Sequence, residues 1–504
     1  MLRKLRLTLA AIFFTAVTLL FLDFTGTIHA WLGWTAKIQF LPALLALNVG
    51  VIIALVALTL IAGRVYCSVI CPMGVFQDIV SNLNTRRKKK NKYRFSYSAE
   101  KKWLRYGILA LFIVAFVAGI GSFVALLAPY SSWGRIVSNL FQPLYKWGNN
   151  LLAYFAERAD SYAFYSTDVW IKSVPTFVIA AVTFVVIGWL AWRNGRTYCN
   201  TVCPVGTVLG FFSRFSLFRP TINLDKCVNC GLCGKSCKAS CIDTKNHKID
   251  YSRCVACMDC LENCTHDALK FESRLKRKPD ARPAETAPAV EATESVDAGR
   301  RNFLGVAGAL AVAGLANAQK KVDGGLAAIE EKKAPERTTR IVPAGALSIR
   351  NFEQHCTACQ LCVSACPNGV LRPSTELTTL MQPEMSYEYG YCRPECTRCS
   401  QVCPAGAILP IQREEKSSTR IGVAVWTPVN CVPVSDGVEC GNCARHCPSG
   451  AIQMVAFNPN DETSVKIPVV NEERCIGCGA CENLCPARPF SAIHVEGREV
   501  HSEY

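Results

Sequence analysis

Two patterns in this chain of 504 residues predict its fold class. Four apolar segments lie within the first 193 residues, and each approaches the roughly 20 residues that a helix needs to cross a bilayer. The remaining sequence is polar and carries six groups of four cysteines at closely similar spacing. We therefore expect a membrane α-helical bundle of four spans, with a fifth if a later segment also inserts, joined to two α+β domains organised by their cysteines.

The apolar segments and the basic residues beside them predict an orientation in the membrane. The four expected spans cover residues 5–22, 40–62, 104–127 and 174–192. Basic residues lie at the N-terminus, at Arg64, at 86–92 and at Arg196, and such residues mark the cytoplasmic ends of spans. We therefore expect loops 23–39 and 128–173 outside. The net charge of +16 is attributed to this orientation, and nucleic acid is not an expected partner.

Both expected helical hairpins end in nearly the same sequence. Gly63-Arg-Val-Tyr-Cys-Ser-Val-Ile-Cys-Pro-Met-Gly74 matches Gly195-Arg-Thr-Tyr-Cys-Asn-Thr-Val-Cys-Pro-Val-Gly206. Two hairpins of like orientation predict a pseudo-twofold axis along the membrane normal. This axis would bring four cysteines to one depth near the cytoplasmic boundary: Cys67, Cys71, Cys199 and Cys203. Three roles stay open for them, namely a shared metal centre, a thiol–disulfide step, or packing as small apolar side chains.

The first two cysteine-rich groups predict a two-cluster domain of the bacterial-ferredoxin type. Each reads Cys-x2-Cys-x2-Cys-x3-Cys, in which three thiolates hold one cubane and the fourth reaches the other cluster. We expect one [4Fe–4S] cluster on Cys227, Cys230, Cys233 and Cys264. The second is expected on Cys254, Cys257, Cys260 and Cys237. Cys241 is surplus, either as a buried thiol or as a substitute for Cys237.

Four further groups predict a second cysteine-rich domain with four [4Fe–4S] clusters. The groups are Cys356/Cys359/Cys362/Cys366, Cys392/Cys396/Cys399/Cys403, Cys431/Cys440/Cys443/Cys447 and Cys475/Cys478/Cys481/Cys485. The extra residues in the second and third groups should loop out without loss of a ligand. Spacing leaves two pairings open, either sequential (first with second, third with fourth) or nested (first with fourth, second with third). Zinc is the main alternative metal for the thiolates of the first two cysteine-rich groups. Covalent c-type haem is excluded because no Cys-x2-Cys-His occurs.

The seam between the cysteine-rich halves carries a targeting signal. Arg300 and Arg301 precede a mildly apolar run that ends at Ala318, as in signals read by the Tat translocase, which exports folded proteins. Cleavage near Ala318 would separate the halves, whereas retention would add a fifth span, and we favour retention. The expected domains are a membrane domain (1–215), a cytoplasmic two-cluster domain (216–275), a linker (276–298), the twin-arginine signal or anchor (299–320) and a periplasmic four-cluster domain (321–504).

These motifs resemble two known families. Residues 1–270, with Cys67/Cys71 before Pro72 and Cys199/Cys203 before Pro204, resemble NapH, a quinol-dehydrogenase subunit of periplasmic nitrate reduction. The same membrane motifs occur in the NosR and CcoG families. Residues 299–504 resemble NapG and its relative MauM, so the chain looks like a NapH–NapG fusion. Likeness to the four-cluster subunits of molybdenum reductases implies the nested pairing.

Together, the motifs and the resemblance predict an electron-transfer protein of the bacterial inner membrane. We expect a quinol dehydrogenase that takes electrons from the quinone pool and passes them to a periplasmic reductase or multihaem cytochrome. The alternatives are a metal-reducing assembly factor of the CcoG type and a NosR-like redox regulator. The sequence identifies no quinol base. Asp23, His29, Asn48 and Asp78 lie near the spans, but each is interpreted as a helix-end or packing residue.

Overall fold

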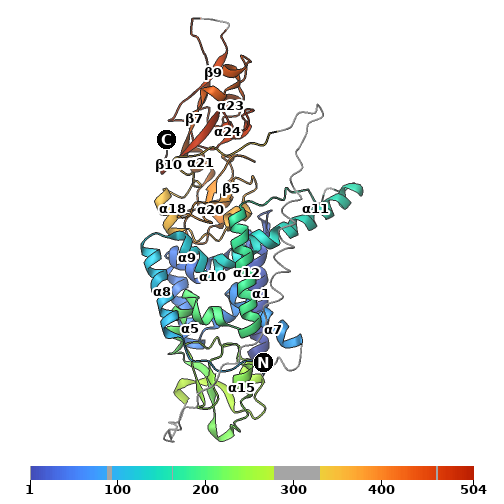
Figure 1. Ribbon diagram of the computed structural model, residues 1–504, viewed down its shortest axis with the longest axis vertical. Coiled ribbons are helices and arrows are strands. Elements are labelled where there is room, and N and C mark those ends of the chain that lie inside the picture. Colours follow the sequence, from blue (N-terminus) through green and yellow to red (C-terminus); the bar gives the residue numbers. More distant parts are fainter. Residues whose placement is uncertain (1, 88–92, 162, 277–329, 461–463, 504) are drawn as a thin grey trace, which may run out of the picture.

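The computed structural model describes residues 2–87, 93–161, 163–276, 330–460 and 464–503. The molecule is elongated, with a helical body in the middle and one cysteine-rich domain at each end (Figure 1). Residues 216–276 form the lower domain in this view and residues 330–503 form the upper one. The twin arginines and the apolar run after them lie outside the described residues, so a fifth span and cleavage near Ala318 stay predictions.

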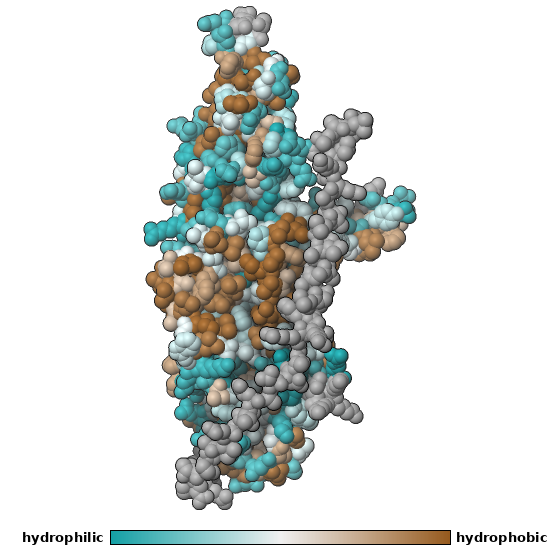
Figure 2. Space-filling model, viewed as in Figure 1, coloured by the Kyte–Doolittle hydropathy of each residue, from teal (hydrophilic) through white to brown (hydrophobic). Residues whose placement is uncertain are grey.

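Two of the four expected spans are continuous helices. They are α1 (Leu2–Leu22) and α12 (Val174–Asn194), each of 21 residues and each long and apolar enough to cross a membrane. At 1.5 Å per residue, such a helix is about 32 Å long, close to the thickness of a bilayer core. Apolar side chains cover a band of the surface over the middle of the body (Figure 2).

The other two expected spans are each divided in two, so a bundle of four spans is not confirmed. Segment 40–62 forms α4 (Phe40–Leu45) and α5 (Val49–Ala62), because Asn48 begins a new helix by accepting a hydrogen bond from the Val51 amide at 3.3 Å. Segment 104–127 forms α8 (Lys102–Val117) and α9 (Gly121–Leu127), with Gly119 at a φ of 76° between them. A hydropathy window does not detect such breaks.

Short helices complete the body and reproduce the internal repeat. After α5 come α6 (Val65–Val69) and α7 (Pro72–Arg87); after α12 come α13 (Thr197–Thr201) and α14 (Pro204–Ser213). Gly63 and Gly195 make the same turn, with φ of 73° and 72°. The outer loops form α2 (Thr27–Leu32), α3 (Trp34–Lys37), α10 (Pro129–Ile136), a π-helical turn (Val137–Phe141) and α11 (Gln142–Arg158). In Figure 1, α11 projects sideways from the body.

The lower domain has the α+β form expected of a small ferredoxin. Strand β1 (Phe218–Ile222) pairs antiparallel with β4 (Leu269–Ser273), and β2 (Ile242–Asp243) pairs with β3 (Lys248–Ile249). The helices are η3 (Leu224–Lys226), α15 (Leu232–Ser236), α16 (Asp259–Glu262) and η4 (Arg274–Lys276). The Leu217 amide donates to the Leu60 carbonyl at 2.7 Å, so this domain is joined directly to the body.

The upper domain contains three two-stranded antiparallel sheets. They pair β5 (Leu371–Pro373) with β6 (Pro383–Met385), β7 (Thr419–Trp426) with β10 (Ile493–Glu503), and β8 (Ile452–Ala456) with β9 (Lys466–Val470). Its helices are α18 (Ile349–His355), α19 (Leu361–Ala365), α20 (Arg398–Val402), α21 (Arg413–Ser418), η5 (Pro428–Asn430), α22 (Val432–Ser435), α23 (Asn442–Arg445) and α24 (Ala480–Leu484). Ser138 and Ser364 share a hydrogen bond of 2.8 Å, which links the domain to the body.

Candidate iron–sulfur sites

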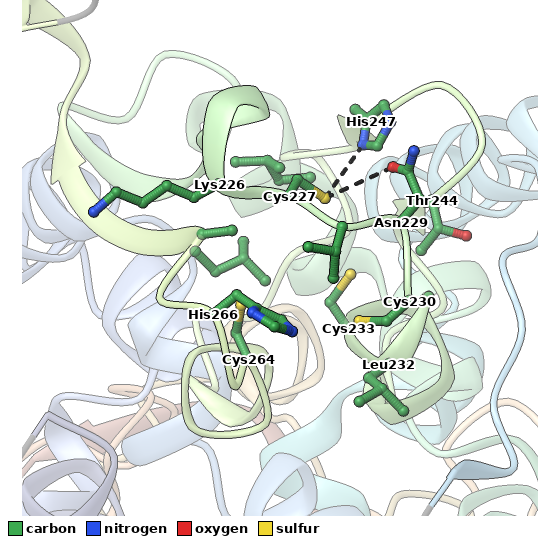
Figure 3. Close-up of a pocket in the computed structure, with 15 residues that line it drawn as sticks. Lys226, Cys227, Asn229, Cys230, Leu232, Cys233, Thr244, His247, Cys264 and His266 are labelled. Carbon is green, nitrogen blue, oxygen red and sulfur yellow. Dashed lines mark hydrogen bonds between the residues drawn. The ribbon is translucent and has the colours of Figure 1, made fainter.

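The first site of the lower domain brings together cysteines from both of its groups. Cys227, Cys230, Cys233 and Cys264 line one pocket, so the last cysteine of the second group faces the first three of the first group (Figure 3). His247 and His266 also line this pocket, and His247 Nδ1 lies 3.8 Å from Cys227 Sγ. Spacing predicted the four cysteines, whereas the two histidines, which lie near these groups in the sequence, were expected to be solvated or packed side chains.

The second site of the lower domain contains a fifth cysteine. The thiol of Cys260 interacts electrostatically with those of Cys257, Cys254 and Cys237, which therefore lie near it. These four cysteines are the set that spacing predicted. Cys241 lies between them, with its sulfur 3.6 Å from that of Cys237 and in hydrogen-bond contact with Cys254. The Cys241 contact lowers the pKa of Cys237 to about 7, which favours its thiolate. Both roles foreseen for Cys241 therefore remain compatible with its position.

Four of the six groups share one backbone conformation. The residue before the second cysteine and the residue after it both have positive φ. The pairs are Asn229/Gly231, Ala256/Met258, Ala358/Gln360 and Gly477/Gly479. An L-residue in this region costs about 1–2 kcal/mol, so a common requirement must hold the non-glycine members there. Such turns aim successive backbone N–H groups into one concavity, where they can bond to thiolate and sulfide.

The sites also suit a cluster better than a single ion. Among the described residues, no group of three or more Cys, His, Asp or Glu side chains has the spacing of a single metal ion. A cubane binds each thiolate to a different iron, so its four sulfurs surround a larger space. Backbone amides point at the cysteines, as where Ala358 N donates to Cys356 Sγ at 3.4 Å and Ala492 N donates to Cys485 Sγ at 3.3 Å.

In the upper domain the first and second groups are paired. Cys356, Cys359, Cys362 and Cys403 line one pocket. The electrostatic neighbours of Cys399 are Cys392, Cys366 and Cys396. Helices α19 and α20 pack side by side, and Cys366 and Cys403 directly follow them. Each fourth cysteine therefore reaches the site of the other group.

The third and fourth groups are paired in the same way. Cys443 lies near Cys440, Cys431 and Cys485, whereas Cys481 lies near Cys478, Cys475 and Cys447. The nested pairing implied by the molybdenum-reductase resemblance is thus wrong for this chain, and the pairing is sequential. Its physical basis is the packing of α19 against α20 and of α23 against α24. The two pairs meet where the Cys392 amide donates to the Cys478 carbonyl at 2.9 Å.

The four cysteines of the membrane repeat also come together, and all are buried. Cys199 has Cys67 as an electrostatic neighbour, and Cys203 has Cys199, Cys71 and Cys67. Burial raises the pKa of Cys71 and of Cys203 well above that of a free thiol. Gln77 Nε2 donates to Cys199 Sγ at 3.2 Å, and Gly206 N donates to Cys203 Sγ at 3.3 Å.

Two buried arginines cross the pseudo-twofold axis at this cysteine quartet (Cys67, Cys71, Cys199 and Cys203). Arg64 donates to the Cys199 carbonyl at 3.1 Å and lies 3.8 Å from Cys67 Sγ. Arg196 donates to the Cys67 carbonyl at 2.8 Å and lies 3.8 Å from Cys199 Sγ. Their exposures are 0% and 1%, so both guanidinium groups face the quartet and not the solvent. Their expected position at the cytoplasmic ends of the spans stays a prediction, but their side chains serve the quartet.

The quartet lies between the two cysteine-rich domains. On the lower side, Arg64 donates to Ser252 O at 3.1 Å, two residues before Cys254. On the upper side, Arg135 donates to Ala358 O at 3.4 Å, one residue before Cys359, and the Arg135 guanidinium interacts electrostatically with Tyr198 and Cys359. The candidate sites therefore follow one another along the molecule from the lower end to the upper end.

Comparison with known proteins gives the family context. A family described as a 4Fe-4S binding domain matches residues 44–91 and 174–223, and one described as a 4Fe-4S dicluster domain matches residues 355–407 and 438–488. The first dicluster match contains the first and second groups, and the second contains the third and fourth groups apart from Cys431, in agreement with sequential pairing. Each 4Fe-4S match in the body contains one Cys-x3-Cys half of the quartet.

Several curated proteins are similar to parts of this chain. An uncharacterised protein of Methanocaldococcus jannaschii is 26% identical over 50% of this chain and 81% of its own length. The methylamine utilization ferredoxin-type protein MauM of Methylobacillus flagellatus is 31% identical over 35% of this chain and 76% of its own length. The ferredoxin-type protein NapG of Escherichia coli is 30% identical over 37% of this chain and 81% of its own length. No solved structure matches the chain.

Proposed function

The chain belongs to the family of ferredoxin-type 4Fe-4S proteins that includes NapG and MauM, and we propose that it carries electrons across a membrane from a quinol to an acceptor on the outer side. The observation that carries this proposal is the continuous series of cysteine sites between the two ends of the molecule. A protein that acted on one side only would not need cysteine-rich domains at opposite ends of an apolar helical body (Figures 1 and 2).

Six [4Fe–4S] clusters would occupy the ferredoxin-type sites. The protein's part is to fix their spacing, their burial and the N–H bonds to sulfur, which together set each potential. Two clusters would lie in the lower domain, on the cytoplasmic side, and four in the upper domain, in the periplasm. The expected content is roughly 24 iron atoms per chain, because each cubane holds four.

We further propose that the quartet holds a seventh cluster between the two domains. Four thiolates suffice for a [2Fe–2S] or a [4Fe–4S] centre, either of which carries about two negative charges in its oxidised form. Arg64 and Arg196 supply two compensating positive charges in a buried site, where an unpaired charge would cost several kcal/mol. The two 4Fe-4S family matches, one over each half of the repeat, support this assignment.

Iron content and spectroscopy of matched variants test the seventh cluster. Cys67→Ala should remove two to four iron atoms per chain and one EPR signal, while the ferredoxin signals remain. Ser68→Ala is the control, because Ser68 is equally buried on α6 and bonds only to the Val65 carbonyl. Unchanged iron content in Cys67→Ala would leave the quartet as thiols or packing residues.

Turnover of the full chain in liposomes tests the electron path. A membrane-soluble quinol should reduce an impermeant acceptor on the side of the upper domain, and Cys67→Ala should abolish this reduction. An assembly factor or a regulator would show no steady flux, even with all clusters present and reducible by dithionite. The terminal partner, a reductase or a multihaem cytochrome, would then be identified by which one accepts electrons from the reduced protein.

A further inference from the structure

The body contains a large cavity that is lined by both apolar and charged side chains. It lies between α1, α7 and the lower domain and has a volume of about 630 Å³, within the range of small-molecule sites. We propose that this cavity is the headgroup site of the quinol, an inference that rests on the proposed function. A quinol needs both an apolar entrance for its chain and polar groups for its two hydroxyls.

The apolar wall consists of side chains from α1 and α7. It contains Leu7, Ala10, Ala11, Phe14, Val75 and Ile79. Leu7 and Ile79 are 40% and 41% exposed, so the apolar wall reaches the outer surface of the helical body. An isoprenoid chain could leave the cavity there without crossing polar surface, because both residues belong to helices of the apolar body.

The charged part of the cavity lies where the start of α1 and α7 meet the lower domain. Arg6 and Lys238 both bind Asp78, at 2.9 Å and 3.0 Å, and all three side chains are buried. Lys238 also binds Asp259 at 2.8 Å, and Arg3 binds Asp259 and Glu262. Arg6 and Lys238 are the donors that could hold a quinol oxygen, and Asp259 and Glu262 are the carboxylates nearest to solvent.

Two candidate redox sites adjoin this network. Arg6 Nε donates to the carbonyl of Cys257 at 3.4 Å, and Lys238 directly follows Cys237, so the second lower site lies against the cavity. Asp78 also binds Arg196 at 2.8 Å. Arg196 in turn contacts the Cys67 carbonyl and Cys199 Sγ. A bound headgroup would therefore lie beside both the second lower site and the quartet.

The reaction at this site balances without a further reactant. The quinol loses two electrons and two protons and becomes a quinone. One electron would pass to each of the two neighbouring clusters, in two successive steps. The two protons would leave to solvent at the charged end of the cavity, where the Glu262 side chain is 53% exposed.

A bulky substitution in the apolar wall tests the location. Ala11→Trp places an indole in the cavity, whereas Ile12→Trp adds the same group to the next residue of α1, which is 58% exposed and does not line the cavity. In the full chain with a short-chain menaquinol analogue, we expect kcat/KM to fall at least tenfold in Ala11→Trp and to stay within twofold in Ile12→Trp. Reduction of the clusters by dithionite should be equal in both.

A photoreactive quinone analogue supplies the second measurement. It should label peptides from α1 and α7 in the wild type and lose this labelling in Ala11→Trp. If the wild type oxidises the quinol, but Ala11→Trp does so equally fast and the label lies elsewhere, the cavity assignment is refuted and the proposed function stands. If dithionite reduces every cluster while no quinol does, both are refuted.

Discussion

The close approach of Gly74 to the cysteine quartet gives a prediction whose size can be worked out. A Cβ at Gly74 would lie 2.1 Å from the Cys67 carbonyl oxygen and 2.6 Å from Arg196 Nη1. Real contacts are at least about 3.0 Å, so Gly74→Ala must move the Cys67 backbone by roughly 0.9 Å and must also shift the Arg196 guanidinium by roughly 0.4 Å. Overpacking of this kind costs about 1–3 kcal/mol, and it displaces a group that contacts Cys199.

A glycine in α8 provides the matched control. A Cβ at Gly107 would meet nothing within 4 Å, so Gly107→Ala should keep or raise stability by up to about 1 kcal/mol through helix propensity. Thermal midpoints at one fixed scan rate compare the two variants, since unfolding of a multidomain protein is often irreversible. Gly74→Ala should unfold a few degrees earlier and lose the iron assigned to the quartet. If both variants kept the same midpoint and iron content, the close packing at Gly74 would be refuted.

Four further predictions address the other sites. Cys264→Ala should remove about four iron atoms per chain, those of the first lower site. If Cys241→Ala also removed about four iron atoms, Cys241 would be a cluster ligand. The double variant Cys356→Ala/Cys403→Ala should lose only one cluster, about four iron atoms, because both residues serve one site; a loss of about eight would restore the nested pairing. Ala358→Gly should raise the thermal midpoint by the equivalent of about 1 kcal/mol, since φ is 49° there; a lower midpoint would contradict this. Burial opposes ionisation of Asp78, but Arg196, Lys238 and Arg6 lower its pKa below that of a free carboxyl group. The ionised carboxylate therefore stabilises the fold above about pH 4, and this stabilisation is lost as pH falls. Asp78→Asn should lower the free energy of unfolding by about 3–5 kcal/mol at pH 7 and make the thermal midpoint less dependent on pH at the acid side.

The sequence predicted those features that depend on local spacing. The exchange of Cys237 and Cys264 between the two lower sites follows from the three-residue gap before each fourth cysteine, which is too short for it to return to its own cluster. The repeat at Gly63 and Gly195 likewise predicted that the two Cys-x3-Cys pairs would meet. In both cases a few adjacent residues determine the geometry.

Features that depend on contacts between distant segments could not be predicted. The pairing of the four upper groups depends on which short helices pack together. Helices α19 and α20 pack together although 32 residues separate the end of α19 from the start of α20. Arg64 and Arg196 look like ordinary basic residues at span ends, and only the tertiary structure shows that each crosses to the opposite repeat. The breaks at Asn48 and Gly119 depend on capping and backbone conformation, which a hydropathy average omits.

The two halves of the repeat carry the same cysteines but differ one helical turn further along the chain, and the large cavity lies beside the first half. Asp78 of α7 corresponds to Gly210 of α14. At Gly210 the space is filled by Arg105, whose Nη2 lies 2.0 Å from where a Cβ would stand and donates to the carbonyls of Gly206 and Ser252. At Asp78 the equivalent arginine, Arg6, is drawn to the carboxylate, and the space beside it stays open. Both halves of the duplicated hairpin thus contribute equally to the quartet, while the difference between Asp78 and Gly210 gives them different surroundings one helical turn further along.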